Sequence, residues 1–245
     1  VYEMDGSVLW SDEGHDGYPA VADFDGDGEP EHVRSGSGEL TLTDTDGTWL
    51  WTTALPGDSG GGPPAVADFD GDGEPEVGVA GISSYTLVDT DGSILWWNVT
   101  DDSSSGQTGS SVFDFEGDGV AEVIYADENA LFVYSGLSGE VLLQVDEHNS
   151  RTVLEYPLIA DVDHDGSTEI VWVSNNFGND TSGWTGITVL GDADESWAQA
   201  RPVWNQHAYH ITNVESDNHI PELQRRNWLT WNSFRAGGTD QGPAH

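Results

Sequence analysis

The sequence contains no cysteine and no lysine, and its six basic residues are all arginine. Without cysteine there can be neither a disulfide nor a thiolate metal site. Acidic residues number 45, which gives a formal net charge of −39. Because phosphate binding needs a basic surface, this balance argues against nucleic acid and anionic membranes as partners and favours cations.

Long apolar runs are also missing. No window of the sequence approaches the roughly 18 consecutive apolar residues of a membrane span, so we expect no membrane insertion. Hydrophobic residues still make up 36% of 245 positions, which is enough for a packed core. A protein outside the cell that has no disulfide needs another means of stabilisation, and a metal ion bound by oxygen is the candidate.

Four copies of one acidic loop are present. The loop reads DFDGDGEPE at Asp23 and again at Asp68, DFEGDGVAE at Asp114, and DVDHDGSTE at Asp161. The copies therefore start 45 to 47 residues apart. A fixed period of this size predicts a repeat architecture, in which each repeat is one supersecondary unit.

A second pattern follows the first three loops: LTLTDTDGTWLW, YTLVDTDGSILWW and LFVYSGLSGEVLLQV. Each predicts a strand, a tight turn and another strand, so that one unit holds four short antiparallel strands. No helical periodicity is evident, and the period matches a β-propeller blade. We therefore predict an all-β fold, a β-propeller of four-stranded antiparallel blades.

The number of blades depends on the two ends of the sequence. VYEMDGSVLW at residues 1–10 resembles the last two strands of a unit that lacks its first two. The stretch ARPVWNQHAYHITNV, residues 200–214, could supply those missing inner strands and complete a shared blade. This arrangement predicts about five blades, and a segment of a larger ring is the alternative.

Each acidic loop has the composition of a calcium site. Side-chain oxygens stand at positions one, three, five and nine, a glycine at six permits the turn, and the carbonyl of position seven is available. Oxygen ligands in this number favour calcium over magnesium and zinc. We predict about four calcium ions, held by the side chains of Asp23, Asp25, Asp27 and Glu31; Asp68, Asp70, Asp72 and Glu76; Asp114, Glu116, Asp118 and Glu122; Asp161, Asp163, Asp165 and Glu169; and the carbonyls of Glu29, Glu74, Val120 and Ser167.

Two other interpretations were weighed. An EF-hand needs a twelve-residue loop between helices, whereas here the closing acid stands at position nine and strands flank the loop. Acidic turns without metal would explain a single copy better than four copies in phase. Glu116 replaces the aspartate of the other loops, so the third site is expected to be the weaker one.

These residues resemble the FG-GAP or VCBS-type repeats of integrin α-subunit propellers and of many bacterial secreted proteins. The resemblance covers about residues 1–190 and rests on the D-x-D-x-D-G-x-x-D/E loop. The sequence departs from the family in using glutamate at position nine and in blade number, since integrin rings have seven. The resemblance implies calcium ions that stabilise blade edges, and a protein that is secreted or displayed on the cell surface.

The repeat pattern ends near Ser196. We therefore predict calcium-binding blades over residues 1–195, a closing or capping segment over 196–236, and a linker-like tail over 237–245. The capping segment holds four of the six arginines and four of the eleven tryptophans. PELQRR, from Pro221, is predicted to begin a short helix.

Several residues of the capping segment allow two readings. His207, His210 and His219 are interpreted first as hydrogen-bonded structural residues, and a metal or catalytic site is the alternative. The tryptophans are interpreted as core residues, with a sugar-stacking platform as the alternative. Asn98 and Asn179 begin N-glycosylation patterns whose use the sequence leaves open.

Three functions follow, in order of preference. The first is a calcium-stabilised extracellular structural or adhesive module that contacts copies of itself or other surface proteins, for example as a subunit of a surface assembly or fibre. The second is a calcium-dependent carbohydrate-binding propeller. The third is a polysaccharide-degrading enzyme that uses His207, Tyr209 or His210, although no catalytic motif supports it, and we predict no catalytic residue.

Overall fold

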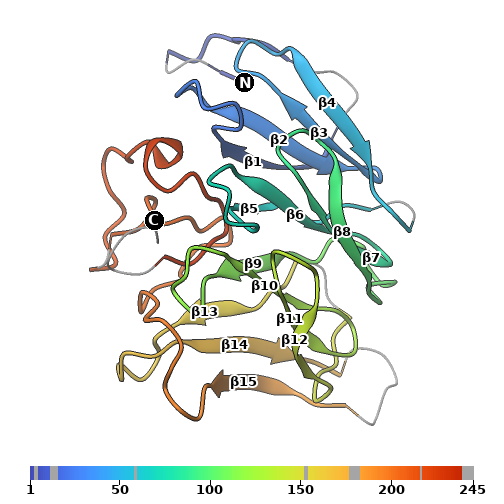
Figure 1. Ribbon diagram of the computed structural model, residues 1–245, viewed down its shortest axis with the longest axis vertical. Coiled ribbons are helices and arrows are strands. Elements are labelled where there is room, and N and C mark those ends of the chain that lie inside the picture. The colour runs from blue at the N-terminus through green and yellow to red at the C-terminus, as the bar shows by residue number, and fades with distance from the viewer. Residues whose placement is uncertain are drawn as a thin grey trace.

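The computed structural model describes residues 1–2, 5–11, 16–57, 60–151, 154–176, 183–215 and 217–238. In these residues the chain forms four separate antiparallel sheets, which we call blades 1 to 4 in chain order (Figure 1). The one helix among them is a short 3-10 turn, η1 (Asn227–Leu229). The predicted all-β class is confirmed.

Three blades have four strands and the last has three, each sheet running in sequence order from its first strand outward. Blade 1 comprises β1 (Tyr18–Ala22), β2 (Glu31–Gly36), β3 (Glu39–Thr43) and β4 (Trp49–Ala54). Blade 2 comprises β5 (Ala65–Ala67), β6 (Glu76–Ala80), β7 (Ser84–Val88) and β8 (Ile94–Val99). Blade 3 comprises β9 (Ser110–Phe113), β10 (Glu122–Ala126), β11 (Leu131–Tyr134) and β12 (Val141–Val145), and blade 4 comprises β13 (Leu158–Ala160), β14 (Glu169–Ser174) and β15 (Gly186–Gly191).

The blades lie face to face in an open series. The first strands touch in order, β1 against β5, β5 against β9 and β9 against β13 (Figure 1). The second and third strands of the central blades are buried on both faces, as β6 and β7 show. The fourth strands alternate between exposed and half-buried residues, because they form the outer edge of the molecule. This radial layering is typical of propeller blades.

One apolar cluster fills the space between each pair of neighbouring blades. The clusters between blades 1 and 2, 2 and 3, and 3 and 4 contain Phe24, Phe69 and Phe115, respectively, each fully buried. Each phenylalanine is the second residue of an acidic loop. The loops are therefore anchored in the cores between blades, and their geometry depends on that packing.

A repeated tryptophan contact joins the outer parts of the blades. The indole N–H of Trp51 in β4 donates to the carbonyl of Thr90 in blade 2 (2.9 Å), and Trp96 in β8 donates to the carbonyl of Gly136 in blade 3. Trp10 makes the equivalent bond to the carbonyl of Thr45 in blade 1 (2.9 Å). Residues 5–10 therefore lie against blade 1 as a fourth strand lies against the next blade.

The turn beneath each indole requires glycine. Gly92 has a φ of 85°, and a Cβ placed on it would lie 2.8 Å from the ring of Trp51. Gly139 has a φ of 72°, and a Cβ there would lie 2.7 Å from the ring of Trp96. Both the backbone conformation and the close approach of the ring exclude a side chain.

The N-terminal arm, which we define as residues 1–2 and 5–10, pairs with itself, and the amino group of Val1 donates to the carbonyl of Trp10 (2.9 Å). Tyr2 and Val8 form an isolated antiparallel bridge, and the N–H of Leu9 donates to the carbonyl of Val1 (3.1 Å). The predicted count of about five blades thus corresponds to four sheets plus this partial unit.

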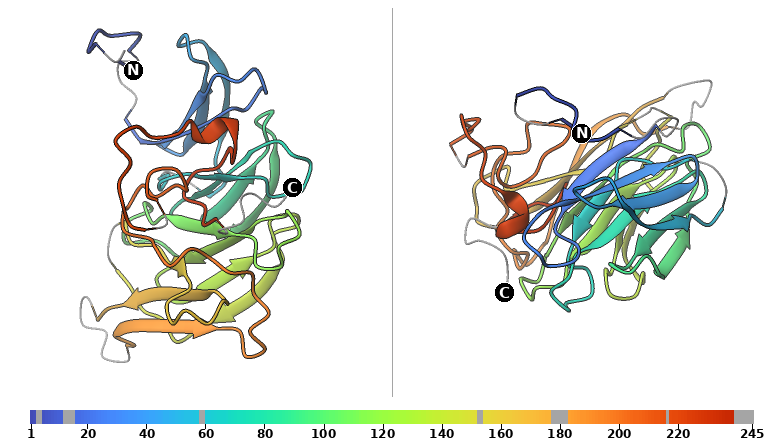
Figure 2. Two further views of the ribbon diagram at one scale, coloured as in Figure 1. Left: turned by 90° about the vertical axis from the view of Figure 1, so that its left-hand side faces the viewer. Right: turned by 90° about the horizontal axis from the view of Figure 1, so that it is seen from above.

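The segment from residue 196 to 238 crosses the inner side of the blades instead of completing a blade (Figure 2). The prediction of inner strands over residues 200–214 is wrong. There the chain forms turns around the buried Arg201, whose guanidinium donates to the carbonyls of Ile211 (2.8 Å) and Val214 (2.9 Å). Phe234 bridges Val66 instead, and a second bridge joins Ala236 to β9.

The predicted helix at PELQRR is also wrong. Residues 221–226 are irregular, and the helical turn begins six residues later, at Asn227. The carbonyl of Asn227 accepts hydrogen bonds from the N–H groups of the residues that follow, and its side chain donates to the carbonyl of Ser233. The local folding of this segment is therefore set by Asn227, which the proline signal did not reveal.

We predict that Trp96→Ala lowers the free energy of unfolding by about 3 kcal/mol, because it removes a large ring from the junction between blades 2 and 3. Trp97→Ala is the matched control. The neighbouring indole is half exposed, so its loss should change stability by no more than about 0.5 kcal/mol. Urea denaturation of both variants measures the difference, and equal effects would contradict the role given to Trp96.

Candidate metal centre

The four acidic loops occupy the same position in every blade, between the first and second strands. The register places the residue before the first aspartate opposite the closing glutamate, as in the pairs Ala22 with Glu31 and Ala67 with Glu76. The third and fourth blades keep this register with Glu122 and Glu169. Strand pairing therefore brings the two ends of each loop together.

The closing glutamate is tied back to the start of its own loop. One carboxylate oxygen, Oε2, accepts the backbone N–H of the second loop residue in all four copies. The acceptors and donors are Glu31 with Phe24 (2.6 Å), Glu76 with Phe69 (2.6 Å), Glu122 with Phe115 (3.0 Å), and Glu169 with Val162 (2.8 Å).

The first aspartate of each loop holds the turn. In the second loop, the two carboxylate oxygens of Asp68 accept the N–H groups of Gly71 (2.7 Å) and Gly73 (3.0 Å). Asp72 in turn accepts the N–H of Glu74 (2.8 Å). The same bonds recur in the first loop, so backbone donors orient the carboxylates toward one another.

The third loop departs where its sequence departs. In the other loops, the side chain at position three accepts the N–H of position five, as Asp70 does from Asp72 (3.2 Å). In the third loop, the N–H of Asp118 donates to Asp114 instead (3.1 Å). With its longer side chain, Glu116 does not accept the N–H of position five as the aspartates of the other loops do. The third loop therefore differs at the residue where its sequence differs.

Each loop gathers three carboxylates whose ligand atoms lie within 4.8 Å of one another. In three loops these are positions one, three and nine, and in the first loop positions one, three and five. Glu31, Asp72, Asp118 and Asp165 are predicted ligands outside these groups, and the four predicted carbonyl ligands stay predictions. The groups are Asp23, Asp25 and Asp27; Asp68, Asp70 and Glu76; Asp114, Glu116 and Glu122; Asp161, Asp163 and Glu169.

Within the described structure, three buried carboxylate oxygens of these loops lack a hydrogen-bond partner: Oε1 of Glu31, Oε1 of Glu76 and Oδ1 of Asp161. A buried carboxylate oxygen without a partner is costly unless a proton or a cation satisfies it. Each belongs to a loop whose other acids converge on the same place. The donor set is oxygen only, which fits calcium and not a thiolate-binding metal.

The electrostatics of the loops point the same way. Burial, reinforced by the neighbouring aspartates, raises the pKa of Glu31 to about 7 and that of Glu76 to about 8. Burial and the adjacent Glu116 raise the pKa of Glu122 to about 8, and burial raises the pKa of Glu169. Without a cation, the closing glutamates therefore retain protons well above the usual range of a carboxyl group.

Residues far away in sequence support two of the loops. Asn232 brackets the start of the first loop, because its Oδ1 accepts the N–H of Asp23 (2.7 Å) and its Nδ2 donates to the Asp23 carbonyl (2.7 Å). Gln199 donates to Asp161 in the fourth loop (3.2 Å). Sequence reasoning missed both, since single amides outside the repeat carry no periodic signal.

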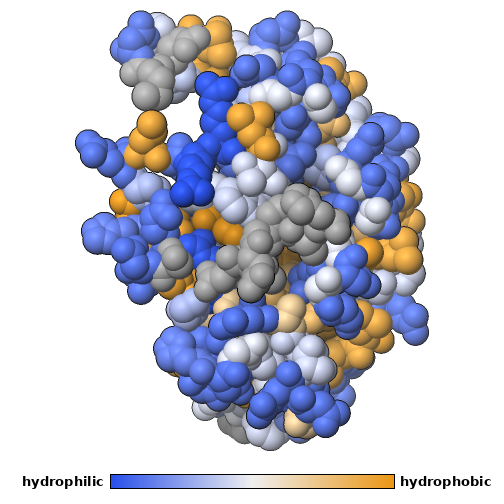
Figure 3. Space-filling view, turned by 60° about the vertical axis from the view of Figure 1, so that its left-hand side comes forward, coloured by the Kyte–Doolittle hydropathy of each residue, from blue (hydrophilic) through white to orange (hydrophobic). Residues whose placement is uncertain are grey.

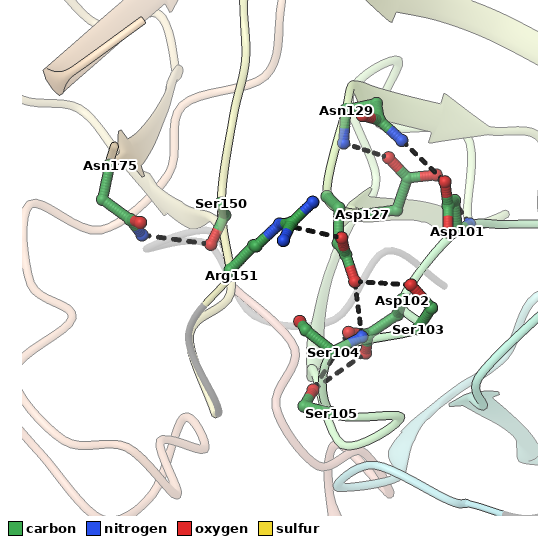
Figure 4. A network of polar contacts seen from close by, with 11 residues as sticks. Asp101, Asp102, Ser103, Ser104, Ser105, Asp127, Asn129, Ser150, Arg151 and Asn175 are labelled. Atoms are coloured by element: carbon green, nitrogen blue, oxygen red, sulfur yellow. Dashed lines mark hydrogen bonds and ion pairs between the residues drawn. The ribbon is translucent and has the colours of Figure 1, made fainter. Parts of the chain in front are cut away.

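A second acidic cluster, in the connections between strands, is organised differently (Figure 4). Asp127 accepts the N–H of Asn129 (2.8 Å), and Glu128 accepts the hydroxyl of Ser103 (3.1 Å) and pairs with Arg151 (3.7 Å). These acids are satisfied by protein donors. We therefore interpret this second cluster as a structural junction, whereas the acidic loops, with their unpartnered oxygens, are the candidate metal centres.

The histidines of the C-terminal segment have structural contacts. A ring nitrogen of His207 lies 3.0 Å from the carbonyl of Leu154, and its ring packs edge-on against Tyr156. His210 stacks on Phe234 with centroids 5.3 Å apart. Among the described residues, none of the three histidines joins a group that could hold a metal. The structural interpretation accounts for His207 and His210, and His219 lies exposed beside Asp217.

The tryptophans divide into two groups. Trp197 packs against Phe115 (4.6 Å between centroids) and Trp204 stacks on Tyr209 (4.5 Å), so both fill apolar space as predicted. Trp228 and Trp231 line a cleft of about 740 Å³ between the second and third acidic loops and the C-terminal segment. The surface on this side is largely hydrophilic, with separate apolar patches (Figure 3).

Within the described part of the chain, the structure contains no helix with the length and apolar character needed to cross a bilayer. Asn98 of the first glycosylation pattern lies in β8, where its side chain donates to the carbonyl of Gly139 (2.7 Å). The second pattern, at Asn179, falls outside the described residues.

Sheets stacked as blades, with an acidic loop between the first two strands of each, define a propeller-like repeat protein. A family model described as an FG-GAP-like repeat matches residues 23–79, so the chain carries FG-GAP-like repeats, as the loop motif predicted. This match spans the first and second acidic loops and ends within β6. No curated protein sequence matches the chain significantly.

One solved structure supports the fold, and two more distant ones are also similar over part of the chain. The V. cholerae biofilm matrix protein Bap1 is similar with a TM-score of 0.89 and 18% identity, over 99% of this chain and 68% of that one. A Bacillus licheniformis rhamnogalacturonan lyase has a TM-score of 0.44 and 19% identity, over 63% and 39% of the two chains. An Agrocybe aegerita lectin specific for non-reducing terminal N-acetylglucosamine has a TM-score of 0.43 and 17% identity, over 74% and 50%.

The raised pKa values predict an unusual pH dependence for the metal-free protein. Between about pH 5 and pH 8 the folded state holds protons on Glu31, Glu76 and Glu122 that the unfolded chain has released. The free energy of unfolding should therefore fall as the pH rises through this interval. Calcium needs the ionised form, so its stabilising effect should grow over the same interval.

Urea denaturation at several pH values, with chelator or with calcium, measures both trends. A metal-free protein that becomes more stable from about pH 5 to pH 8 would contradict the assignment.

Proposed function

We propose that this protein is a calcium-stabilised extracellular module with a structural or adhesive role. The observation that carries the proposal is the convergence of three carboxylates in each of four equivalent loops, with a buried unpartnered oxygen in three of them. Protons or cations must satisfy such groups at neutral pH. Outside the cell, calcium is the abundant cation whose preferred ligands match these loops.

In this proposal the ions are held by the predicted side chains at positions one, three, five and nine of each loop. Bound calcium neutralises mutual repulsion between carboxylates that the chain itself holds together. Four ions carry eight positive charges and would change the net charge from −39 to −31. The protein would remain acidic, so each ion acts locally, on one loop and the blade junction beneath it.

The extracellular and adhesive part of the proposal rests on two supporting observations. The chain carries FG-GAP-like repeats, and its fold resembles that of a biofilm matrix protein. An enzymatic role is not proposed, because His207 and His210 already serve structural contacts and Tyr209 is buried in an apolar cluster.

We predict that Glu76→Gln weakens calcium stabilisation whereas Glu74→Gln does not. Glu76 is buried with an unpartnered oxygen, and the Glu74 side chain is exposed two residues away. At a calcium concentration a hundredfold above the dissociation constant, one site contributes about 2.7 kcal/mol. Glu76→Gln should remove roughly that amount from the calcium-induced rise in unfolding free energy.

Thermal melting with and without calcium, together with calcium titration by calorimetry, measures both variants. The unaltered protein should bind about four ions per chain. A melting temperature that chelator leaves unchanged would overturn the calcium proposal.

The cleft beside Trp228 and Trp231 favours glycan binding as a second candidate. Both indoles are half-buried and border the cleft, where an aromatic face can pack against a sugar ring, and calcium in the adjacent second and third loops would offer coordination to sugar hydroxyls. Trp231→Ala should abolish binding to a calcium-supplemented glycan array, whereas Trp97→Ala should not, because Trp97 is half exposed and does not line the cleft. An array without signal for the unaltered protein would remove this candidate.

A further inference from the structure

The first aspartate of the fourth acidic loop is held differently from its three equivalents. In loops one to three, backbone N–H groups of the loop itself donate to both carboxylate oxygens of this residue. In the fourth loop, Oδ2 of Asp161 accepts the N–H of Gly166 (3.2 Å), whereas Oδ1 is buried and has no partner among the described residues. Position four, whose N–H makes the missing bond elsewhere, is glycine in the other loops and His164 here.

A side chain of the C-terminal segment supplies a donor in place of the missing one. Nε2 of Gln199 donates to Oδ2 of Asp161 (3.2 Å), so one bond from the loop and one from outside it orient this carboxylate. Asp161 is 2% exposed, whereas the first aspartates of the other loops are only partly buried. Both bonds are made by Oδ2, which leaves Oδ1 as the atom available to a cation.

The same part of the C-terminal segment is fastened to the fourth loop by Thr168. The hydroxyl of this fully buried residue donates to the carbonyl of Ala198 and accepts the N–H of Ala200 (2.7 Å). The N–H of Ala198 donates in turn to the carbonyl of Phe115 in the third loop (2.8 Å). The equivalents of Thr168 in the other loops have no hydroxyl and are Pro30, Pro75 and Ala121.

The unpartnered oxygen belongs to a group that converges. Ligand atoms of Asp161, Asp163 and Glu169 lie within 4.8 Å of one another. A carboxylate has a broad torsional preference about the bond to its Cβ, so hydrogen bonds must set the direction in which Oδ1 points. In loops one to three the loop backbone does this alone, whereas in the fourth loop the task is shared with Gln199.

We propose that Gln199 is a positioning residue of the fourth metal centre, and that binding of a divalent cation there is coupled to docking of residues 197–200. This inference concerns the regulation of one of the proposed calcium sites and therefore rests on the proposed function. It distinguishes the fourth site from the other three, whose first aspartates are oriented within their own loops.

The coupling acts in both directions. The docked segment holds Asp161 in the orientation that presents Oδ1 to the group, so docking raises the affinity for the cation. Coupling between two binding equilibria is reciprocal, and a bound cation therefore stabilises the docked segment by the same factor.

Calorimetric titration of calcium into the full chain tests the role of Gln199. Loss of a hydrogen bond that orients a metal ligand typically weakens metal binding 10- to 100-fold, and we expect Gln199→Met to weaken one of the four sites by about tenfold. Gln144→Met is the matched control, because the amide of Gln144 also donates to an aspartate, Asp146 (2.7 Å), outside the acidic loops. The control should bind all four ions as the unaltered protein does.

A double variant assigns the effect to the fourth loop. Asp163→Asn removes one carboxylate of the fourth group and should leave three ions bound. Adding Gln199→Met to it should change the remaining affinities no further, because residues that act through the same site are not additive. In chelator, Gln199→Met should melt at the temperature of the unaltered protein, since residue 199 is exposed.

Hydrogen exchange of the amide protons of Ala198 and Ala200 reports the docking of the segment, because both N–H groups donate across this contact. Calcium should slow their exchange by about tenfold in the unaltered protein, by the reciprocity of the coupling. In Asp163→Asn, calcium should leave their exchange unchanged although the other three sites are filled.

The results that would overturn the proposal differ from failure of the calcium role itself. Four ions bound equally well by Gln199→Met, a further loss of affinity in the double variant, or calcium-dependent protection that persists in Asp163→Asn would each overturn this inference alone. A lowered melting temperature in chelator with unchanged calcium affinity would assign Gln199 a structural role only. An unaltered protein that binds no calcium would overturn the proposed function and this inference with it.

Discussion

The structure depends on the carboxylate that begins the second strand of each blade. One oxygen of this glutamate accepts the N–H of the second loop residue, and in three blades that residue is a phenylalanine of the core. The other oxygen of Glu31 and of Glu76 is buried without a partner. The packing of the core therefore fixes a negative charge where water cannot reach it, and a proton or a cation must balance that charge.

The acidic loops and the tryptophan contacts act at the same end of the sheets. In an antiparallel sheet, the loop between strands one and two and the turn between strands three and four lie side by side. Thr90 joins them in blade 2, since its hydroxyl donates to the carbonyl of Pro75 and its own carbonyl accepts the indole of Trp51. A proton or cation that neutralises a loop therefore also stabilises the neighbouring turn, which the tryptophan of the preceding blade contacts.

The sequence predicts the features that repeat and misses those that occur once. The period, the acidic loops and the strand–turn–strand pattern are local signals, and four copies reinforce them. Asn232 binds Asp23 across 209 positions, with no second copy to reveal the pairing. The prediction of inner strands over residues 200–214 was wrong for a related reason. The buried Arg201 organises that segment by donating to backbone carbonyls, and a bond to a backbone carbonyl leaves no pattern in the sequence.

The departures from the repeat are themselves informative, because they occur together. Blade 3 has Leu143 at the register position where blades 1 and 2 have Trp51 and Trp96. The turn it faces in blade 4 has Glu195, at a φ of 52°, where the others have glycine. A turn with no indole above it has room for a side chain, although the left-handed backbone of Glu195 still costs of order 1 kcal/mol.

The face of blade 4 that no described blade covers is also apolar. Val162 stands where the other three loops have phenylalanine and is 46% exposed. Val173, Ile187 and Val189 remain aliphatic at exposed positions where a solvated sheet would ordinarily carry polar residues. The turn position beneath a neighbouring indole thus differs from glycine where that indole is missing, whereas the positions that face another sheet in blades 1 to 3 are apolar in blade 4 as well.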